Sequence, residues 1–257
     1  MTQEEMLARV LHRDGLMIVI DKPAGLPVHR GPKGGENLED SFDALRFGLP
    51  RAPALAHRLD RETSGCLVLG RHRKALAHLG LLFKHGEVKK TYWAVVEGGP
   101  EADEGTIDMP LGRLDETRGW WMKPDPNGLP SVSTWHVLGR SGAAGAGATG
   151  PGTGAGPLVG SLTGPLAWLA LSPLTGRTHQ LRVHCAAMGF PILGDTIYGR
   201  GPRFGGPGLH LHAREIVVPL SKNKPPVRVT APVPPHLAAA LTACGWRGEA
   251  EAPDAQP

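Results

Sequence analysis

The chain between positions 56 and 71 reads AHRLDRETSGCLVLGR. A Thr-Ser-Gly turn signal at 63–65 precedes the apolar run Cys66–Leu69, which is typical of a buried strand. Asp60 is therefore expected on a loop that runs directly into a strand. Two ordinary structural explanations exist for a carboxylate between two arginines, since it can cap the turn or pair with one of its neighbours. These residues alone leave structural and functional interpretations open.

Apolar patterns on both sides of this stretch indicate further strands and helices. Leu16–Ile20 is a strand signal closed by turn-forming residues at 21–25, and 91–96 is a second strand signal rich in β-branched and aromatic residues. Residues 38–47 and 74–83 have the apolar spacing of helices. Strands with few helices and no regular strand–helix alternation predict an α+β fold with a mainly antiparallel sheet.

A Gly/Ala/Pro-rich insertion around 140–164 separates two strand-like runs at 135–138 and 167–171. It lacks the large apolar residues needed to offset its ordering entropy, so we expect a flexible loop. The two runs it joins could pair as a long hairpin. Residues 248–257 are expected to form a disordered tail, which leaves a single domain over 1–247.

A second polar cluster, SPLTGRTHQLRVHCAAMG, occupies positions 172–189 and predicts a turn followed by a short helix. Three residues at i, i+4 and i+7 are expected to face the core: Leu181, Cys185 and Met188. Three others are expected on a polar side of the helix: Arg177, Gln180 and His184. An arginine at such a helix start could bind a phosphate or hold a carboxylate through two hydrogen bonds.

Positive charge is distributed unevenly along the chain. The 28 Lys and Arg exceed the 24 Asp and Glu only slightly, which gives a formal net charge of +4. Six basic residues nevertheless lie between Arg51 and Lys74, and six more lie between Arg200 and Arg228. Clustered cations attract a phosphate backbone. Scattered solvated charges explain the same pattern equally well.

Several other functions have little support. The three cysteines are far apart, so neither a disulfide framework nor a cysteine zinc site is indicated, and a reducing cytoplasm is expected. The histidines lack metal-site spacing, and no serine elbow, phosphate loop or dinucleotide fingerprint is present. No signal peptide or membrane-length apolar run is seen. We therefore expect no metal, no cofactor and no membrane association.

Four ordered stretches closely resemble the RluA-type family of RNA pseudouridine synthases. They are residues 21–29, 57–65, 88–98, and 174–184 continuing at 194–199. The resemblance covers roughly residues 14 to 236 apart from the Gly/Ala-rich insertion, and a match of four blocks in order is far more specific than one motif. It implies a pseudouridine synthase fold: α+β, with a mainly antiparallel mixed β-sheet, flanking helices and a central catalytic cleft.

The resemblance also implies roles for single residues. The family's catalytic aspartate falls on Asp60, its active-site tyrosine on Tyr92, and the arginine that pairs with the catalytic carboxylate on Arg177. Arg58 matches the arginine that helps to displace the target base. The other candidates for binding RNA are His57, Arg61, Lys89 and Lys90. The N-terminal RNA-binding module of many relatives is not seen before the first block, which leaves the choice of substrate open.

The implied reaction breaks the N1–C1′ bond of uridine and rejoins the base through C5, which requires neither a metal nor a cofactor. Its expected partner is RNA, either tRNA, rRNA or both, with the target nucleotide flipped out of its stack. A cytoplasmic monomer without an obligate protein partner is expected. Two other functions remain: a non-catalytic RNA-binding protein, and a metal-dependent hydrolase or nuclease that combines Asp60 with histidines.

Overall fold

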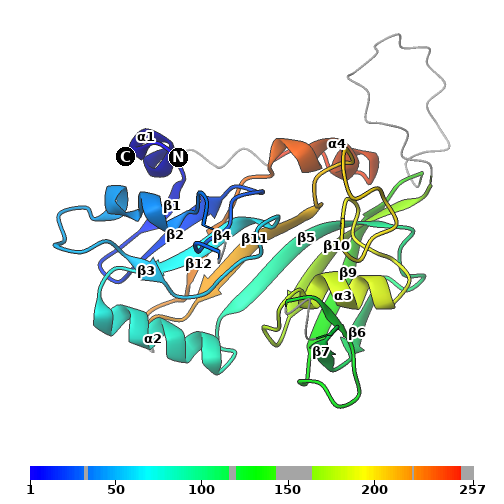
Figure 1. The fold of residues 1–257 in the computed structure, drawn as a ribbon, viewed down its shortest axis with the longest axis horizontal. Coiled ribbons are helices and arrows are strands. Elements are labelled where there is room, and N and C mark those ends of the chain that lie inside the picture. The colour runs from blue at the N-terminus through cyan, green and yellow to red at the C-terminus, as the bar shows by residue number, and fades with distance from the viewer. Residues whose placement is uncertain (32–33, 116–119, 143–163, 222, 250–257) are drawn as a thin grey trace, which may run out of the picture.

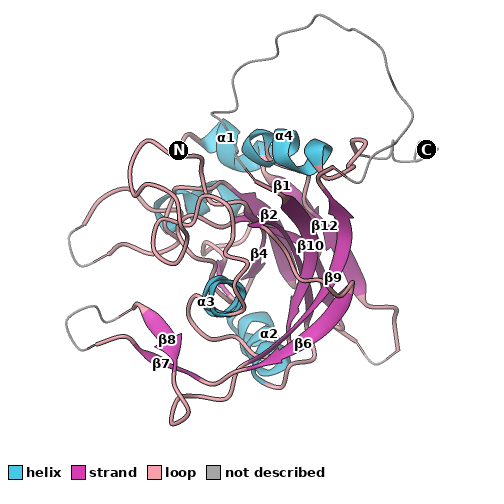
Figure 2. Ribbon diagram, turned by 90° about the vertical axis from the view of Figure 1, so that its right-hand side faces the viewer, coloured by secondary structure: helices cyan, strands magenta, loops and turns pink. Residues whose placement is uncertain are grey.

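The computed structural model describes residues 1–31, 34–115, 120–142, 164–221 and 223–249. Within these residues, ten strands form one continuous sheet with helices on both faces (Figure 1). A two-stranded hairpin of β7 (Leu111–Arg113) and β8 (Met122–Pro124) stands apart from the sheet. Figure 2 shows this hairpin on the side of the sheet that carries α3 (Gln180–Ala187).

The sheet strands are β1 (Val10–Arg13), β2 (Met17–Lys22), β3 (Ala54–Leu55), β4 (Ser64–Gly70), β5 (Lys89–Glu97), β6 (Glu104–Asp108), β9 (Val132–Arg140), β10 (Leu166–Pro173), β11 (Leu211–Val218) and β12 (Val227–Thr230). The remaining helices are α1 (Gln3–Ala8), η1 (Glu39–Leu45), α2 (Arg73–Lys84) and α4 (Pro235–Ala243). The predicted strands at 16–20, 66–69 and 91–96 and the predicted helix at 74–83 all form, each within two residues of the expected bounds at most ends.

The strand order is β1-β2-β4-β11-β5-β10-β9-β6, with β3 beside β4 and β12 beside β11. Each pairing between these described strands is antiparallel, except for a short parallel contact of β4 with β11. The α+β fold with a mainly antiparallel sheet is therefore confirmed. β9 and β10 form the expected long hairpin, paired from Arg140 opposite Ala167 to Ser133 opposite Pro173.

Alternating side chains explain why helices cover both faces of the sheet. Ile18 and Ile20 of β2 pack in a core that includes residues of α1 and η1, whereas Met17 and Val19 pack with residues of α2. A strand with apolar residues on both faces is stable only when both faces are covered. In the other half of the sheet, β5 divides its side chains in the same way between α3 and α4.

The helix expected over 38–47 forms as the 3-10 helix η1 rather than as an α-helix. Leu38, Phe42 and Leu45 are buried, as their spacing predicted. The Ser41 N–H donates to the carbonyl three residues earlier, at 3.1 Å. Phe47 and Gly48 both have positive φ, 44° and 82°, and this left-handed pair ends the segment.

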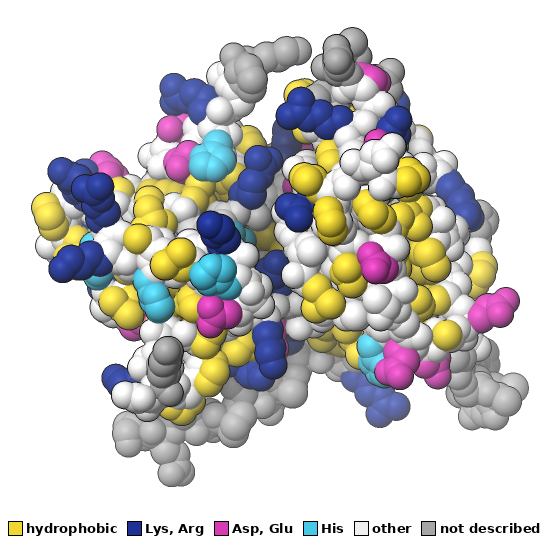
Figure 3. All heavy atoms as spheres, turned by 90° about the horizontal axis from the view of Figure 1, so that it is seen from below, with side chains coloured by type: hydrophobic (Ala, Val, Ile, Leu, Met, Phe, Trp, Pro, Cys, Tyr) yellow, Lys and Arg dark blue, Asp and Glu magenta, His cyan; other side chains and the backbone are white. Residues whose placement is uncertain are grey.

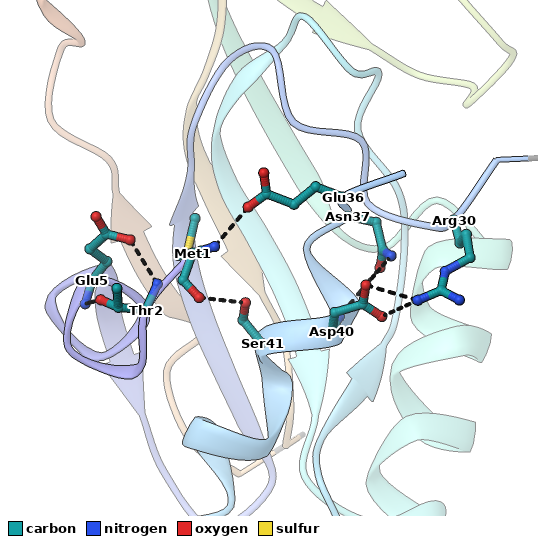
Figure 4. Close-up of polar contacts among 8 residues, drawn as sticks. All are labelled: Met1, Thr2, Glu5, Arg30, Glu36, Asn37, Asp40 and Ser41. Atoms are coloured by element: carbon teal, nitrogen blue, oxygen red, sulfur yellow. Dashed lines mark hydrogen bonds and ion pairs between the residues drawn. The ribbon is translucent and has the colours of Figure 1, made fainter. Parts of the chain in front are cut away.

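The N-terminal residues are fastened to the segment that precedes and begins η1 (Figure 4). The Met1 ammonium lies 2.7 Å from a carboxylate oxygen of Glu36, and the Ser41 hydroxyl donates to the Met1 carbonyl at 3.3 Å. Thr2 and Glu5 form a capping box that satisfies backbone N–H groups at the start of α1. These contacts hold α1 against η1.

Two predicted flexible regions lie largely outside the described residues: 143–163 of the insertion and 250–257 of the tail. Glu249, inside the expected tail, is described, and it accepts hydrogen bonds from Arg214 at 2.7 Å and from the Val233 N–H at 2.8 Å. The single domain over 1–247 stays a prediction. None of the described helices has the length and apolar character needed to cross a bilayer.

Candidate active site

A cleft of about 1100 Å³ lies between the end of α2, the start of β5 and the loop that joins β10 to α3. It is lined by all the predicted site residues except Arg61: His57, Arg58, Asp60, Lys89, Lys90, Tyr92 and Arg177. Arg61 instead donates from Nε to the carbonyl of Gly25 at 2.9 Å. Seen from below, Lys and Arg side chains gather along a hollow between the two halves of the molecule (Figure 3).

The turn that carries Asp60 is held by Lys22, whose side chain is fully buried. Its Nζ donates to the carbonyls of Pro23, Arg61 and Thr63 at 2.7, 2.9 and 2.9 Å. The Thr63 N–H donates to the Asp60 carbonyl at 3.1 Å and closes the turn. Burial lowers the pKa of Lys22 to about 7, against the opposing effect of nearby carboxylates. The backbone around Asp60 is therefore fixed by one buried lysine side chain.

Gly65 allows β4 to approach β11 directly behind this turn. A Cβ at Gly65 would lie 2.3 Å from the carbonyl oxygen of Ala213, and its φ of +105° also favours glycine. The two strands pair at Ser64 opposite His212 and at Gly65 opposite Ala213. Asp60 is thus anchored beside the one parallel contact among the described sheet strands, between the two halves of the sheet.

The Asp60 side chain, 20% exposed, faces His179 rather than Arg177. Oδ2 of Asp60 lies 3.9 Å from Nε2 of His179. Arg177 donates from Nε to the Pro130 carbonyl at 3.1 Å, and its N–H is bound by the Gln180 side chain at 3.0 Å. Among the described residues, the expected ion pair of Arg177 with Asp60 does not form, because these contacts direct Arg177 toward the segment before β9. The catalytic role of Arg177 stays a prediction.

His179 caps α3 in a left-handed backbone conformation, with φ of 51°. Its Nδ1 lies 2.9 Å from the hydroxyl of Tyr198, and that hydroxyl accepts a hydrogen bond from the Met122 N–H at 2.9 Å. Burial lowers the pKa of His179, while the negative charge of Asp60 opposes this shift. A neutral imidazole therefore lies beside the Asp60 carboxylate at neutral pH.

Tyr92 and His57 form parts of the cleft wall. Tyr92 packs against apolar clusters in both halves of the molecule. Burial raises its pKa well above the usual tyrosine range, with a further contribution from Asp60, so the hydroxyl keeps its proton at neutral pH. His57 accepts the Val68 N–H at 3.0 Å and stacks on Phe83, and burial lowers its pKa to about 3. His57 is therefore neutral at this wall, and its role in binding RNA stays a prediction.

The comparisons with known proteins agree with this geometry. The sequence profile of the family described as RNA pseudouridylate synthase matches residues 16–187. An uncharacterized RNA pseudouridine synthase of Zymomonas mobilis is 40% identical over 234 residues, which cover 88% of this chain and 94% of that protein. Ribosomal large subunit pseudouridine synthase C of Vibrio cholerae is 34% identical over 244 residues, which cover 91% of this chain and 68% of that protein. The chain belongs to the RluA-type family of RNA pseudouridine synthases.

A solved structure supports the same assignment. Human RNA pseudouridylate synthase domain containing 4 superimposes with a TM-score of 0.71 at 26% sequence identity, over 94% of each chain. The predicted pseudouridine synthase fold is confirmed, and this synthase is an isomerase that acts on RNA.

Arg182 and Asp195 of the synthase are functional candidates that the sequence analysis missed. Arg182 donates from Nε and Nη2 to the two carboxylate oxygens of Asp195, both at 2.7 Å, and both side chains are buried. Asp195 also accepts the N–H groups of Ile197 and Tyr198. In the sequence, the arginine and the aspartate each lie within a stretch that resembles the family. Their pairing was not visible, because thirteen residues separate them.

The expected faces of α3 are partly wrong for this synthase. Leu181 and Cys185 are buried as predicted, but Met188 is 43% exposed, and the polar side that carries Gln180 and His184 is buried. The Gln180 amide donates to the Val132 carbonyl and the Ser133 hydroxyl of β9, both at 2.9 Å. His184 is likewise bonded to Ser133, at 3.0 Å. Helical spacing identifies a polar stripe but not a strand that satisfies it.

The cations that line the cleft come from several separate segments of the synthase rather than from two continuous clusters. They are Arg58, Lys84, Lys89, Lys90, Arg177, Arg182 and Arg228. Arg71, one of the basic residues between Arg51 and Lys74, does not line the cleft and donates to the Asp14 carbonyl at 2.7 Å. Within the described part of the chain, no three His, Cys, Asp or Glu side chains are grouped as a metal site would require.

Proposed function

We propose that this synthase isomerises uridines in rRNA, tRNA or both, and that Asp60 is its nucleophile. One observation carries the proposal: the Asp60 carboxylate lies in a cation-lined cleft of about 1100 Å³, on a turn that a buried lysine holds in place. The name of the Vibrio cholerae relative makes large-subunit rRNA the first candidate substrate. Mapping pseudouridines in total RNA from cells with and without the protein tests this choice of RNA.

The proposed reaction uses few groups. The N1–C1′ bond of uridine breaks, the detached uracil turns within the cleft, and a C5–C1′ bond forms while C5 loses a proton and N1 gains one. Asp60 can attack C1′, stabilise a glycal, or add to C6 of the base. Each route requires an ionised carboxylate and an enclosed space that retains the free uracil. The cleft provides that enclosure beside Asp60.

Tyr92 and Arg58 have different proposed roles around the base. Because the Tyr92 hydroxyl keeps its proton, it serves as a hydrogen-bond donor and its ring as a stacking surface, rather than as an ionised base. Arg58 is exposed at the cleft, next but one to Asp60, where its side chain can fill the space that a flipped nucleotide leaves. The exposed Lys89 and half-buried Lys90 are proposed to contact phosphates.

The test replaces Asp60 by Asn, which keeps the side-chain volume but removes the charge and the nucleophile. Tritium release from C5-labelled uridine in an RNA that the wild type modifies is expected to fall by at least about a thousandfold. Glu62→Gln is the matched control, because it removes an equal charge from the same turn and is 45% exposed. It is expected to keep near-wild-type activity.

The melting temperature and the RNA affinity at fixed salt are measured on the same preparations. We expect the Asp60→Asn protein to remain folded and to bind RNA. A folded Asp60→Asn protein with near-wild-type tritium release would exclude Asp60 as nucleophile. Loss of stability, with activity lost only in proportion to the folded fraction, would instead give Asp60 a structural role.

A further inference from the structure

A chain of polar groups connects the β7–β8 hairpin to the Asp60 carboxylate. The Met122 N–H, at the start of β8, donates to the Tyr198 hydroxyl at 2.9 Å. That hydroxyl lies 2.9 Å from Nδ1 of His179, and the opposite ring nitrogen, Nε2, lies 3.9 Å from Oδ2 of Asp60. Of the four polar groups in this series, only Asp60 has a role in the reaction described above.

The hydrogen-bond pattern favours a proton on Nε2 of His179. The Tyr198 oxygen already accepts the Met122 N–H, so its own proton needs an acceptor. Within the described ranges, Nδ1 of His179 is the acceptor within hydrogen-bonding distance of that hydroxyl. A neutral imidazole whose Nδ1 accepts must carry its proton on Nε2. The resulting N–H faces a carboxylate, the favourable electrostatic arrangement.

Neighbouring contacts hold the backbone of His179 in a left-handed conformation. A φ of 51° is uncommon for a residue with a side chain, and such residues persist where neighbouring contacts fix them. The imidazole is 9% exposed and meets the Tyr198 ring edge-on, with ring centroids 5.6 Å apart. These contacts hold the imidazole beside Asp60 at the start of α3.

Tyr198 is itself rigidly placed. Its N–H donates to Oδ1 of Asp195 at 3.0 Å, and the Arg182 guanidinium lies 5.4 Å from the centre of its ring. Asp195 is in turn bound by Arg182 through two hydrogen bonds. The buried ion pair therefore orients the hydroxyl that selects the His179 tautomer.

We propose that His179 is a positioning residue that orients the Asp60 carboxylate through its Nε2–H, and that Tyr198 fixes the required tautomer. This inference rests on the proposed role of Asp60 as nucleophile. A carboxylate fixed in one orientation loses less freedom when it attacks, so removal of the imidazole should slow the chemical step more than it weakens RNA binding. Because Met122 belongs to β8, the hairpin is connected to this orientation.

The tautomer is measured directly and without substrate. Long-range proton–nitrogen correlation spectra of protein labelled with ¹⁵N-histidine distinguish the protonated nitrogen from the one that carries the lone pair. His179→Asn identifies the signal by its loss. The wild type is expected to carry the proton on Nε2, and Tyr198→Phe to shift population toward Nδ1–H. An Nδ1–H wild type would overturn the proposal whatever the activity.

Kinetics give the second readout. Two variants are used, His179→Asn and His179→Gly, because Asn and Gly both tolerate positive φ. Each is expected to lower kcat about tenfold, with KM changed by less than about twofold. Tyr198→Phe should lower kcat in the same direction. His236→Asn is the matched control, since His236 is half-buried, bonds to the Leu209 carbonyl and does not line the cleft. Its kcat should match the wild type.

The failures of the two proposals are distinguishable. Wild-type kcat in both folded His179 variants, together with an inactive Asp60→Asn protein, overturns the positioning role and leaves the nucleophile in place. An active Asp60→Asn protein removes the nucleophile itself. A loss of RNA binding equal to the loss of kcat would assign His179 to substrate binding and would also overturn the inference.

Discussion

Lys22 fixes the position of the loop that carries Asp60 without lining the cleft. An ammonium group has three donors and no acceptor, and here all three meet backbone carbonyls, those of Pro23, Arg61 and Thr63. The Asp21-Lys-Pro block is part of the family resemblance, but a lysine at the end of a strand signal reads equally well as a solvated charge. Complete burial of its side chain excludes the interpretation as a solvated charge.

Lys22→Met tests whether the Lys22 side chain holds this turn in place. The variant keeps most of the apolar stem but leaves three buried carbonyls without their donor, so the free energy of unfolding should fall by about 2–4 kcal/mol. Urea denaturation measures the loss. Lys224→Met, at an exposed position, is the control and should change stability by less than about 0.5 kcal/mol. Equal stability of the two variants would show that other contacts hold the turn.

The β9–β10 hairpin is closed before the insertion begins. The Ser141 N–H donates to the Leu166 carbonyl at 2.9 Å, and the Leu166 N–H donates to the Ser141 hydroxyl at 2.7 Å. The ends of the insertion therefore lie side by side. A shorter connection between them leaves the strand register unchanged, and the entropy of closing a loop depends only weakly on its length.

Replacing residues 143–163 by a short Gly/Asn turn is accordingly expected to leave the melting temperature within a few degrees and tritium release near wild type. A scrambled insertion of equal length is the control for composition. If the shortened protein folds but loses turnover while the scrambled one keeps it, the length of this stretch is needed for the reaction.

Sequence periodicity predicted the positions of the helices and strands better than it predicted which of their side chains are buried. The strands β2, β4 and β5 and the helix α2 carry simple apolar patterns, and they form where expected. Helical spacing placed Gln180 and His184 on a polar side of α3, but it did not predict that β9 covers this side and supplies buried hydrogen-bond partners. Such pairings join residues about fifty positions apart and become visible only when the sheet order is known.

The candidate site shows the same limit. Family motifs located Asp60, Tyr92 and Arg58 in what proves to be one cleft, since motif residues carry over position by position. The contact of Asp60 with His179 rather than Arg177 depends on the left-handed turn before α3, and no local pattern announces a positive φ at a histidine. The backbone conformation of a single residue, His179, therefore determines which side chain contacts Asp60, and the motif did not predict it.

Across the whole molecule, buried histidines make stability depend on acid. Burial lowers the pKa of His57 to about 3 and those of His210 and His212 to about 4. Unfolded histidine titrates near pH 6.5, so between about pH 6.5 and 4 the unfolded chain binds protons that the native protein excludes. Each such histidine then removes up to about 1.4 kcal/mol of stability per pH unit as the pH falls.

Asp21 acts in the opposite direction. Burial raises its pKa to about 6, so from about pH 6 down to 4 the native state binds the extra proton and gains stability. Taken alone, these four groups, three histidines against one carboxyl, give a net loss of about 3 kcal/mol per pH unit at the steepest point. Urea midpoints measured from pH 7 to 4.5 should therefore fall as the pH falls.

His212→Gln identifies the cause of this slope. It removes one titrating group, so the dependence on pH should become shallower by up to about 1.4 kcal/mol per unit, even if stability at pH 7 also drops. Ser64→Ala is the matched control, because it deletes the hydroxyl that lies 2.9 Å from Nδ1 of His212 but keeps the imidazole. That variant should lose stability without losing slope. If His212→Gln keeps the wild-type slope, acid sensitivity comes from groups other than this buried imidazole, and the carboxylates of the buried ion pairs become the next to replace.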